Sequence, residues 1–320
     1  MDDELNVTYF TFHGHVDLNK YRFLYFFIMF TVYVLILFFN VSIVCLIWIH
    51  KNLHEPMYIF IAALLINAVL YSTNIYPKLL IDFLSDKQII SYSACLFQFF
   101  VFYTLSGSES LLLSVMSYDR YVSICKPLQY PTIMRKTRVS ILLVSAWSVP
   151  ACHVAVTVIL VTQSKTCNFT IQGIFCNYAV YGLQCVQSRA LTIYGIVPLL
   201  DHIIVPLLFI IFTYTKILII VYQSSREVRK KAAETCLPHL IVLTSFFCLC
   251  VYDITVSRME ANLSTLTHLI ITLQKVLYHP LFNPLIYGLK LKAISRHLKA
   301  LLCPKKKTGL TAAFKGQEFC

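Results

Sequence analysis

Seven apolar runs, each long enough to cross a lipid bilayer, restrict how this chain can fold more than any other feature. They lie near residues 22–48, 57–83, 92–118, 139–161, 191–222, 237–257 and 264–288. About 20 helical residues span the hydrocarbon core, and uninterrupted apolar runs suit helices rather than the alternating strands of a membrane barrel. With 58% hydrophobic and 13% charged residues, the chain is more apolar than a soluble domain. The sequence predicts an all-α membrane protein with a seven-transmembrane helix bundle.

Positive charge collects on one side of the predicted bundle. The net charge of +12 rests mostly on segments after the third, fifth and seventh runs: Lys126, Arg135, Lys136 and Arg138; Arg226, Arg229, Lys230 and Lys231; Lys290, Lys292, Arg296, Lys299 and Lys305 to Lys307. Basic loops face the cytoplasm, so the N-terminus is expected outside, where the sequon at Asn6 could be glycosylated. Because membrane topology accounts for these charges, the lipid bilayer is the expected partner and nucleic acid is not.

The chain is expected to form one membrane domain with short ends. Residues 1–21 would be an extracellular N-terminus, 22–288 the seven-transmembrane domain, and 289–320 an amphipathic helix and cytoplasmic tail. The acidic start lacks the basic region and cleavage site of a signal peptide, so the first span is expected to direct insertion. Leucines and basic residues alternate at helical spacing in the tail, which suits the anionic inner leaflet. Cys303 could be palmitoylated or remain unmodified.

Four cysteines lie on the predicted outer side. The longest loop, near 162–190, carries Cys167, Cys176 and Cys185, and Cys95 stands at the outer start of the third span. The outside is the oxidising compartment, so two disulfides are possible. Four cysteines allow three pairings, and their spacing does not choose among them.

Four motifs carry a family resemblance: LHEPMY at 53–58, MSYDRYVSICKPLQYP at 116–131, KAAETCLPHL at 231–240 and PLFNPLIYGLK at 280–290. In order and sidedness they resemble the signatures of vertebrate odorant receptors, a branch of the rhodopsin-like (class A) G-protein-coupled receptors. Details such as NVTYFTF near the start and YPKLLIDFLS in the second span look most like the receptors of bony fishes.

The resemblance implies a receptor rather than an enzyme, with no cofactor. Such a receptor binds a small, water-soluble odorant in the upper bundle and activates a heterotrimeric G protein of the stimulatory olfactory type, which raises cyclic AMP. The plasma membrane of olfactory sensory neurons is the implied location. A non-olfactory chemosensory receptor of the same class remains the main alternative.

The resemblance also implies disulfide pairs and a ligand site. It pairs Cys95 with Cys176 and Cys167 with Cys185. Its ligand-binding positions correspond here to Phe102, Tyr103, Ser106, His153, His202, Cys250, Val251, Ile254 and Leu273. An apolar set with a few polar members suits a small organic molecule, although a single His or Tyr at such a depth can equally be a packing residue.

Arg258 is a further candidate ligand residue. It lies eleven residues after Phe247, about 16 Å toward the outside on a helix, near the roof of the expected pocket. A guanidinium can bind a carboxylate through two hydrogen bonds, so one hypothesis is an anionic ligand. In the other, Arg258 extends into solvent or pairs with Asp253 or Glu260.

A charged pair marks the inner end of the third span. Arg120 would be costly there without a partner, and the adjacent Asp119 can neutralise it. By resemblance this pair, with Tyr121, restrains the closed bundle until the carboxy-terminal helix of the G-protein α subunit enters. The resemblance assigns switch roles to four further residues, Tyr214, Asn283, Pro284 and Tyr287.

Glu109 is an acid inside the predicted third span. It lies eleven residues before Arg120, about three helical turns, so it faces the bundle interior as Arg120 does. We expect its carboxyl group to be protonated, hydrated or hydrogen-bonded, with either a structural or a gating role. Ala68, beside Asn67, occupies the position where the wider receptor class usually has a sodium-coordinating Asp. A sodium site therefore lacks its usual ligand, and no metal site is predicted.

Two other classes of membrane protein fit less well. The retinal lysine of an opsin would lie seven residues before the last-span proline, whereas Lys275 lies nine before Pro284, a rotation of about 200° on a helix. A transporter or channel would be expected to show repeated halves, broken helices or a row of charges, and we find no such repeat.

Overall fold

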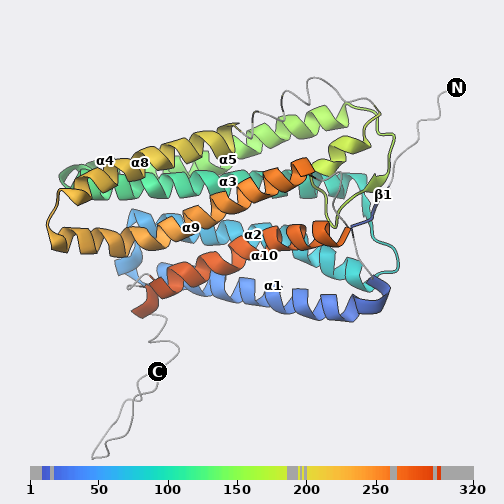
Figure 1. The fold of residues 1–320 in the computed structure, drawn as a ribbon, viewed down its shortest axis with the longest axis horizontal. Helices are drawn as coiled ribbons and strands as arrows, with labels where there is room; N and C mark the ends of the chain where they lie inside the picture. The colour runs from blue at the N-terminus through green and yellow to red at the C-terminus, as the bar shows by residue number, and fades with distance from the viewer. Residues whose placement is uncertain are drawn as a thin grey trace, which may run out of the picture.

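The computed structural model describes residues 9–14, 18–185, 194, 197, 200–259, 265–290 and 294–296. Long helices lie side by side as a bundle, with the N-terminal strand at one end (Figure 1). In chain order the main elements are β1 (Tyr9–Phe12), α1 (Leu18–Ile49), α2 (Pro56–Leu84), β2 (Ile89–Ser91), α3 (Tyr92–Cys125), α4 (Tyr130–Ile133), α5 (Lys136–Thr162), β3 (Thr170–Ile171), α8 (Val205–Tyr222), α9 (Arg226–Met259) and α10 (Thr265–Lys290). Short turns of other helix types are η1 (Lys51–Leu53), η2 (Pro127–Gln129), η3 (Tyr178–Leu183) and η4 (Leu200–Ile204).

Six of the described helices are long and apolar enough to cross a membrane. They are Lys20–Ile49, Pro56–Leu84, Tyr92–Cys125, Lys136–Thr162, Leu200–Tyr222 and Ala232–Cys250. The helix α10 occupies the position of the seventh predicted run and packs against α1, α2 and α9. The predicted seven-transmembrane bundle is confirmed. Prolines inside the helices, such as Pro77, Pro150 and Pro238, are tolerated because packed neighbours can satisfy the backbone groups that proline frees.

The helix α3 lies at the centre of the bundle. It packs against α2, α5, α8 and α9, and its buried residues extend along its length from Cys95 to Val122. By contrast, α1 exposes many large apolar side chains, including Phe23, Phe27 and Trp48, as expected of a helix that faces lipid.

A small sheet covers the end of the bundle at which β1 lies, where the sequence predicted only helices and loops. This end is called outer here and the opposite end inner, following the orientation that the sequence predicts. Its strand order is β2-β1-β3; β1 is antiparallel to β2, with Phe10 opposite Ile90, and parallel to β3, with Thr11 opposite Thr170. Strands of two to four residues are too short to show a clear alternation of apolar and polar residues. The sheet joins three segments far apart in sequence.

Candidate functional site

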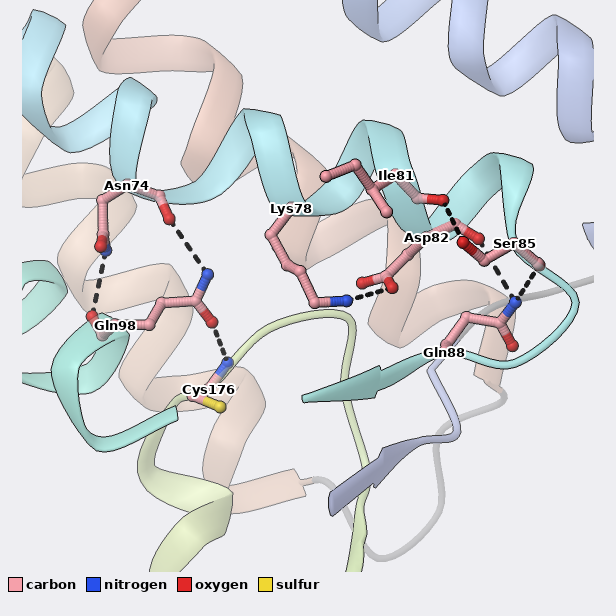
Figure 2. A network of polar contacts seen from close by, with 8 residues as sticks. All are labelled: Asn74, Lys78, Ile81, Asp82, Ser85, Gln88, Gln98 and Cys176. Atoms are coloured by element: carbon pink, nitrogen blue, oxygen red, sulfur yellow. Dashed lines mark hydrogen bonds and ion pairs between the residues drawn. The ribbon is translucent and has the colours of Figure 1, made fainter. Parts of the chain in front are cut away.

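One disulfide and an amide network hold the long outer loop against the bundle, and a second disulfide joins two parts of the loop. Cys95, near the start of α3, is bonded to Cys176, and Cys167 to Cys185, the same pairs that the resemblance implies. Gln98 Oε1 accepts a 2.9 Å hydrogen bond from the backbone nitrogen of Cys176. Gln98 and Asn74 exchange side-chain to backbone bonds of 3.1 and 3.0 Å (Figure 2). The loop is therefore fixed to both α2 and α3 at Cys176.

Aromatic side chains fill the outer part of the bundle beneath this loop. The ring centroid of Phe102 lies 4.8 Å from that of Phe175 in the loop and 5.1 Å from that of Tyr71 on α2. The side chain of Phe102 is 1% exposed. The backbone nitrogen of Tyr178 donates to the hydroxyl oxygen of Tyr103 at 3.0 Å. The loop thus contacts two of the predicted ligand residues directly.

A polar cluster lies between α5 and the start of the fifth span. His153 Nδ1 and His202 Nε2 are 3.3 Å apart and share a hydrogen bond, and Asp201 Oδ2 is 3.8 Å from His153 Nδ1. Asp201 and His202 belong to the π-helical turn η4, a type of turn frequent at functional sites. A Cβ atom added to Gly107 of α3 would be 2.9 Å from His202 Nδ1. Glycine therefore lets the imidazole approach α3 closely.

The structure groups some of the predicted ligand residues. Phe102 packs in an apolar cluster of the outer half, and Tyr103 and Leu273 lie against the same cluster. His153 and His202 form the separate polar pair. Two kinds of side chain are thus grouped here, one aromatic and one able to donate and accept hydrogen bonds.

Other predicted ligand residues are less closely grouped. Ser106 is half-buried on α3, whereas Cys250 is half-buried on α9 and packs against the apolar cluster that reaches the inner half. Three predicted ligand residues lie on α9 at positions where the structure describes the backbone and not the side chain: Val251, Ile254 and Arg258.

Sequence reasoning missed several residues that contact the predicted ones. Tyr71 and Phe175 pack on Phe102, and Asp201 lies against His153. A signal existed for two of them, because Phe175 precedes the disulfide cysteine and Asp201 precedes His202. No such signal existed for Tyr71, because its contact with Phe102 depends on which face of α2 packs against α3.

Glu109 links α3 to α10 at mid-bundle. Its side chain is 12% exposed, and its Oε1 accepts a 3.1 Å hydrogen bond from Asn283 Nδ2. His279 Nδ1 is 3.7 Å from the same oxygen. Glu109 is therefore hydrogen-bonded, one of the states expected for it. Ala68 is buried, and the adjacent Asn67 donates a 2.9 Å hydrogen bond to the carbonyl oxygen of Leu105.

No metal site is found in the part of the chain that the structure describes. No three His, Cys, Asp or Glu side chains among those residues are grouped so that they could hold an ion. The carboxyl group of Glu109 is engaged by neighbouring nitrogen atoms instead.

A buried ion pair with a third member lies at the inner end of α3. Arg120 Nη2 is 2.5 Å from Asp119 Oδ2, and Tyr130 of α4 donates to Asp119 Oδ1 at 2.8 Å. Asp119 is completely buried. Burial, with the charge of Asp119, raises the pKa of Tyr130 well above its ordinary value, so this phenol stays protonated and remains a donor. The neighbouring Tyr121 ring lies 6.0 Å from Lys126 Nζ.

The predicted switch residues of the fifth and seventh spans also lie inside the bundle. The hydroxyl group of Tyr214 on α8 forms a 2.6 Å hydrogen bond with His239 Nδ1 on α9. On α10, Pro284 follows Asn283, and Tyr287 is fully buried with no hydrogen-bond partner for its hydroxyl group among the described residues. Asn6 and Cys303, two predicted modification sites, lie outside the described residues.

Comparison with known proteins gives one consistent result. A family model described as olfactory receptor matches residues 29–305. The chain is 33% identical to human olfactory receptor 11A1 over 304 residues, which cover 94% of this chain and 95% of the relative. It is 35% identical to human olfactory receptor 13C2 over 296 residues, 90% of this chain and 92% of the relative. The similarity thus extends over most of the bundle.

Proposed function

The chain belongs to the olfactory receptor family of G-protein-coupled receptors, and from this premise we propose that it binds a small organic odorant in the outer half of its bundle and activates a heterotrimeric G protein at the inner end. As a multi-pass membrane protein of this family it is a receptor and not an enzyme. The finer proposal is a G protein of the stimulatory olfactory type, with cyclic AMP as the product that rises.

The observation that carries this proposal is the arrangement of α3. Its outer half holds Phe102 and Tyr103 beneath the disulfide-bonded loop, and its inner end holds Asp119 and Arg120. A continuous helix joins the two, with Glu109 bonded to α10 between them. One packed element thus contacts both the proposed ligand site and the proposed G-protein site, and a rigid helix of this kind can carry coupling between distant sites.

The proposed ligand site combines the aromatic and polar side chains described above. Its members are Phe102, Tyr103, Ser106, His153, His202, Cys250, Val251, Ile254, Arg258 and Leu273. An apolar enclosure with a few hydrogen-bonding groups suits a small organic molecule. The proposed coupling residues are Asp119, Arg120, Tyr121, Tyr214, Asn283, Pro284 and Tyr287.

The proposed topology places the N-terminus outside the cell and α4 in the cytoplasm. The two disulfides at the β1 end of the bundle support this orientation, because disulfides persist in the oxidising extracellular environment. In this orientation Leu128, which is 96% exposed beside α4, lies on the face that a G protein would meet.

A cyclic-AMP reporter assay tests the proposed function. The expressed receptor is screened against water-soluble odorants sorted by charge, and Arg120→Ala serves as the matched control at equal surface level. We expect at least one odorant to raise cyclic AMP through the parent and none through the variant, because Arg120 belongs to the proposed G-protein site at the inner end of α3. An equal response from Arg120→Ala, or no nucleotide exchange on an added G protein, would contradict the proposal.

A further inference from the structure

The N-terminal strand β1 is the central strand of the outer sheet. It pairs with β2, between α2 and α3, on one side and with β3 of the long loop on the other. The strand order shows that β2 and β3 do not pair with each other. The link that the sheet provides between these two loops therefore runs through β1.

Side-chain burial shows that β1 is packed into the protein rather than lying on its surface. Phe10 is 0% and Phe12 3% exposed, whereas Tyr9, the first residue of the strand, is 56% exposed. Both phenylalanines belong to the outermost apolar cluster, with Ile171 of β3 and Cys176. This alternation fixes the register of the strand, because a slip by one residue would expose both rings.

Backbone hydrogen bonds extend the contact between the N-terminal segment and the long loop. The nitrogen atoms of Thr11, His13 and Gly14 donate to the carbonyl oxygens of Phe169, Ile171 and Gly173, at 2.9, 3.0 and 3.1 Å. The donors follow one another along the N-terminal segment, and the acceptors follow one another along the loop. The N-terminal segment is therefore hydrogen-bonded to the loop as far as Gly173, next to the loop residues that pack into the bundle.

Gly14 marks the closest approach of these two segments. A Cβ atom on Gly14 would be 2.5 Å from the carbonyl carbon of Gly173, a backbone atom that cannot rotate away. Ile174 and Phe175 follow directly and are 2% and 3% exposed. Phe175 packs on Phe102, so one continuous series of contacts connects β1 to a proposed ligand residue.

We propose that β1 is a positioning strap of the ligand site: by pairing with β3 and packing Gly14 on Gly173, it holds Ile174 and Phe175 in the outer mouth of the bundle against Phe102. The disulfide and Gln98 fix this loop segment on its C-terminal side, at Cys176, and β1 fixes it on its N-terminal side. Figure 2 shows the hydrogen bond between Gln98 and the backbone nitrogen of Cys176. That the held segment shapes ligand binding rests on the proposed function; that β1 holds it does not.

Reactivity of a buried cysteine tests the strap without any agonist. Ile174→Cys is introduced into the full-length receptor, the two native disulfides are verified by peptide mapping, and a membrane-impermeant charged maleimide is added to intact cells. In the parent the thiol is buried and labels slowly. With Gly14→Ala we expect labelling on the order of tenfold faster at equal surface level, because local opening controls the reactivity of a buried group.

Gly182→Ala is the matched control, because it lies in the same loop and an added Cβ atom would meet nothing within 4 Å. We expect parent-like labelling from it. If Gly14→Ala does not reach the surface, Phe10→Leu replaces it, since this change keeps the backbone and only reduces the packing of β1. Labelling that neither variant accelerates would overturn the strap, even for a receptor that responds normally to odorants.

A second measurement concerns ligand recognition. Once the screen supplies an agonist, Gly14→Ala should lower its potency about tenfold, whereas Gly182→Ala should not, because loss of a preorganised contact weakens binding. Faster labelling with unchanged potency would contradict the part of the proposal that concerns the ligand. If no agonist is found, the proposed function fails while the labelling result still decides whether β1 holds the loop.

Discussion

Asp119 is completely buried, yet both of its carboxylate oxygens have partners, Oδ2 in Arg120 and Oδ1 in Tyr130. A charge taken out of water costs several kcal/mol unless it is paired and hydrogen-bonded. Arg120 pairs with only one of the two carboxylate oxygens, and Tyr130 supplies the hydrogen bond to the other. The pair was visible in the sequence. Tyr130 was not, because its contact depends on how η2 turns the chain back toward α3.

We predict that Tyr130→Phe raises ligand-independent signalling. The change removes a hydrogen bond to a charged group, which is worth about 1.5–3 kcal/mol, and so weakens the proposed restraint on Arg120 by roughly tenfold or more. Basal cyclic AMP at matched surface level measures it, with the exposed Tyr222→Phe as control. Because the raised pKa keeps Tyr130 protonated, basal activity of the parent should not change through this group between cytosolic pH of about 6.5 and 8. Unaltered basal activity in Tyr130→Phe would contradict the restraint.

Substitution of Arg258 tests whether the ligand is an acid. If its guanidinium binds a carboxylate, Arg258→Ala should remove the response to an acidic odorant by roughly a hundredfold, while the neutral ester loses little, because charge-assisted double hydrogen bonds are specific to the anion. Concentration–response curves for the acid and ester pair decide this. Agonists that prove neutral or cationic, with potency untouched by the variant, would leave His153, His202 and Tyr103 as the polar candidates.

Element by element, the sequence predicted helices well and their short exceptions poorly. The third apolar run ends near 118, but α3 continues to Cys125, because a helix can extend past the apolar run, and Pro127 disfavours helical backbone only at Lys126 before it. The strands β1, β2 and β3 were missed because each has two to four residues and pairs with partners distant in sequence. The π-helical turn at Leu200–Ile204 was missed because its extra residue leaves the apolar composition unchanged.

That turn leads to a prediction about Gly107. An alanine there would place Cβ 2.9 Å from His202 Nδ1 and 3.0 Å from Pro150 Cβ, closer than such atoms pack. We expect Gly107→Ala to displace the imidazole, break its bond to His153 and lower odorant potency about tenfold, since a misplaced polar group loses its binding geometry. Potency is compared at equal surface level with Gly182→Ala, whose Cβ would meet nothing. Equal potency of both variants would show that the close approach of His202 to α3 is not needed.

For the whole molecule, composition predicted the bundle, and the orientation that the charges indicate stays a prediction, whereas contacts between distant helices required the structure. Asn40 Nδ2 on α1 donates to the carbonyl oxygen of Pro280 at 2.8 Å across 240 residues, and Asn283 reaches Glu109 across 174. Periodicity places each residue on a helix face but does not say which helix that face meets. Motif resemblance assigned a role to Asn283 and could not name Glu109 as its partner.

The bond between Glu109 and Asn283 therefore supplies a prediction for the molecule as a unit. If it couples α3 to α10 during activation, Glu109→Ala and Asn283→Ala, each of which removes the hydrogen bond, should have non-additive effects on the fraction of active receptor, with a coupling energy of about 0.5–3 kcal/mol, as expected for residues in contact. Agonist-stimulated nucleotide exchange of the parent, both single variants and the double variant completes the cycle.

A second cycle provides the control. It combines Asn283→Ala with Ser164→Ala, whose hydroxyl group donates to the carbonyl oxygen of Leu160 at the outer end of α5, and is expected to be additive because distant, independent sites add. Additivity in both cycles would mean that Glu109 and Asn283 act separately. Coupling confined to the first would mean that the carboxyl group of α3 and the amide of α10 change state together, and that the signal crosses the centre of the bundle through their contact.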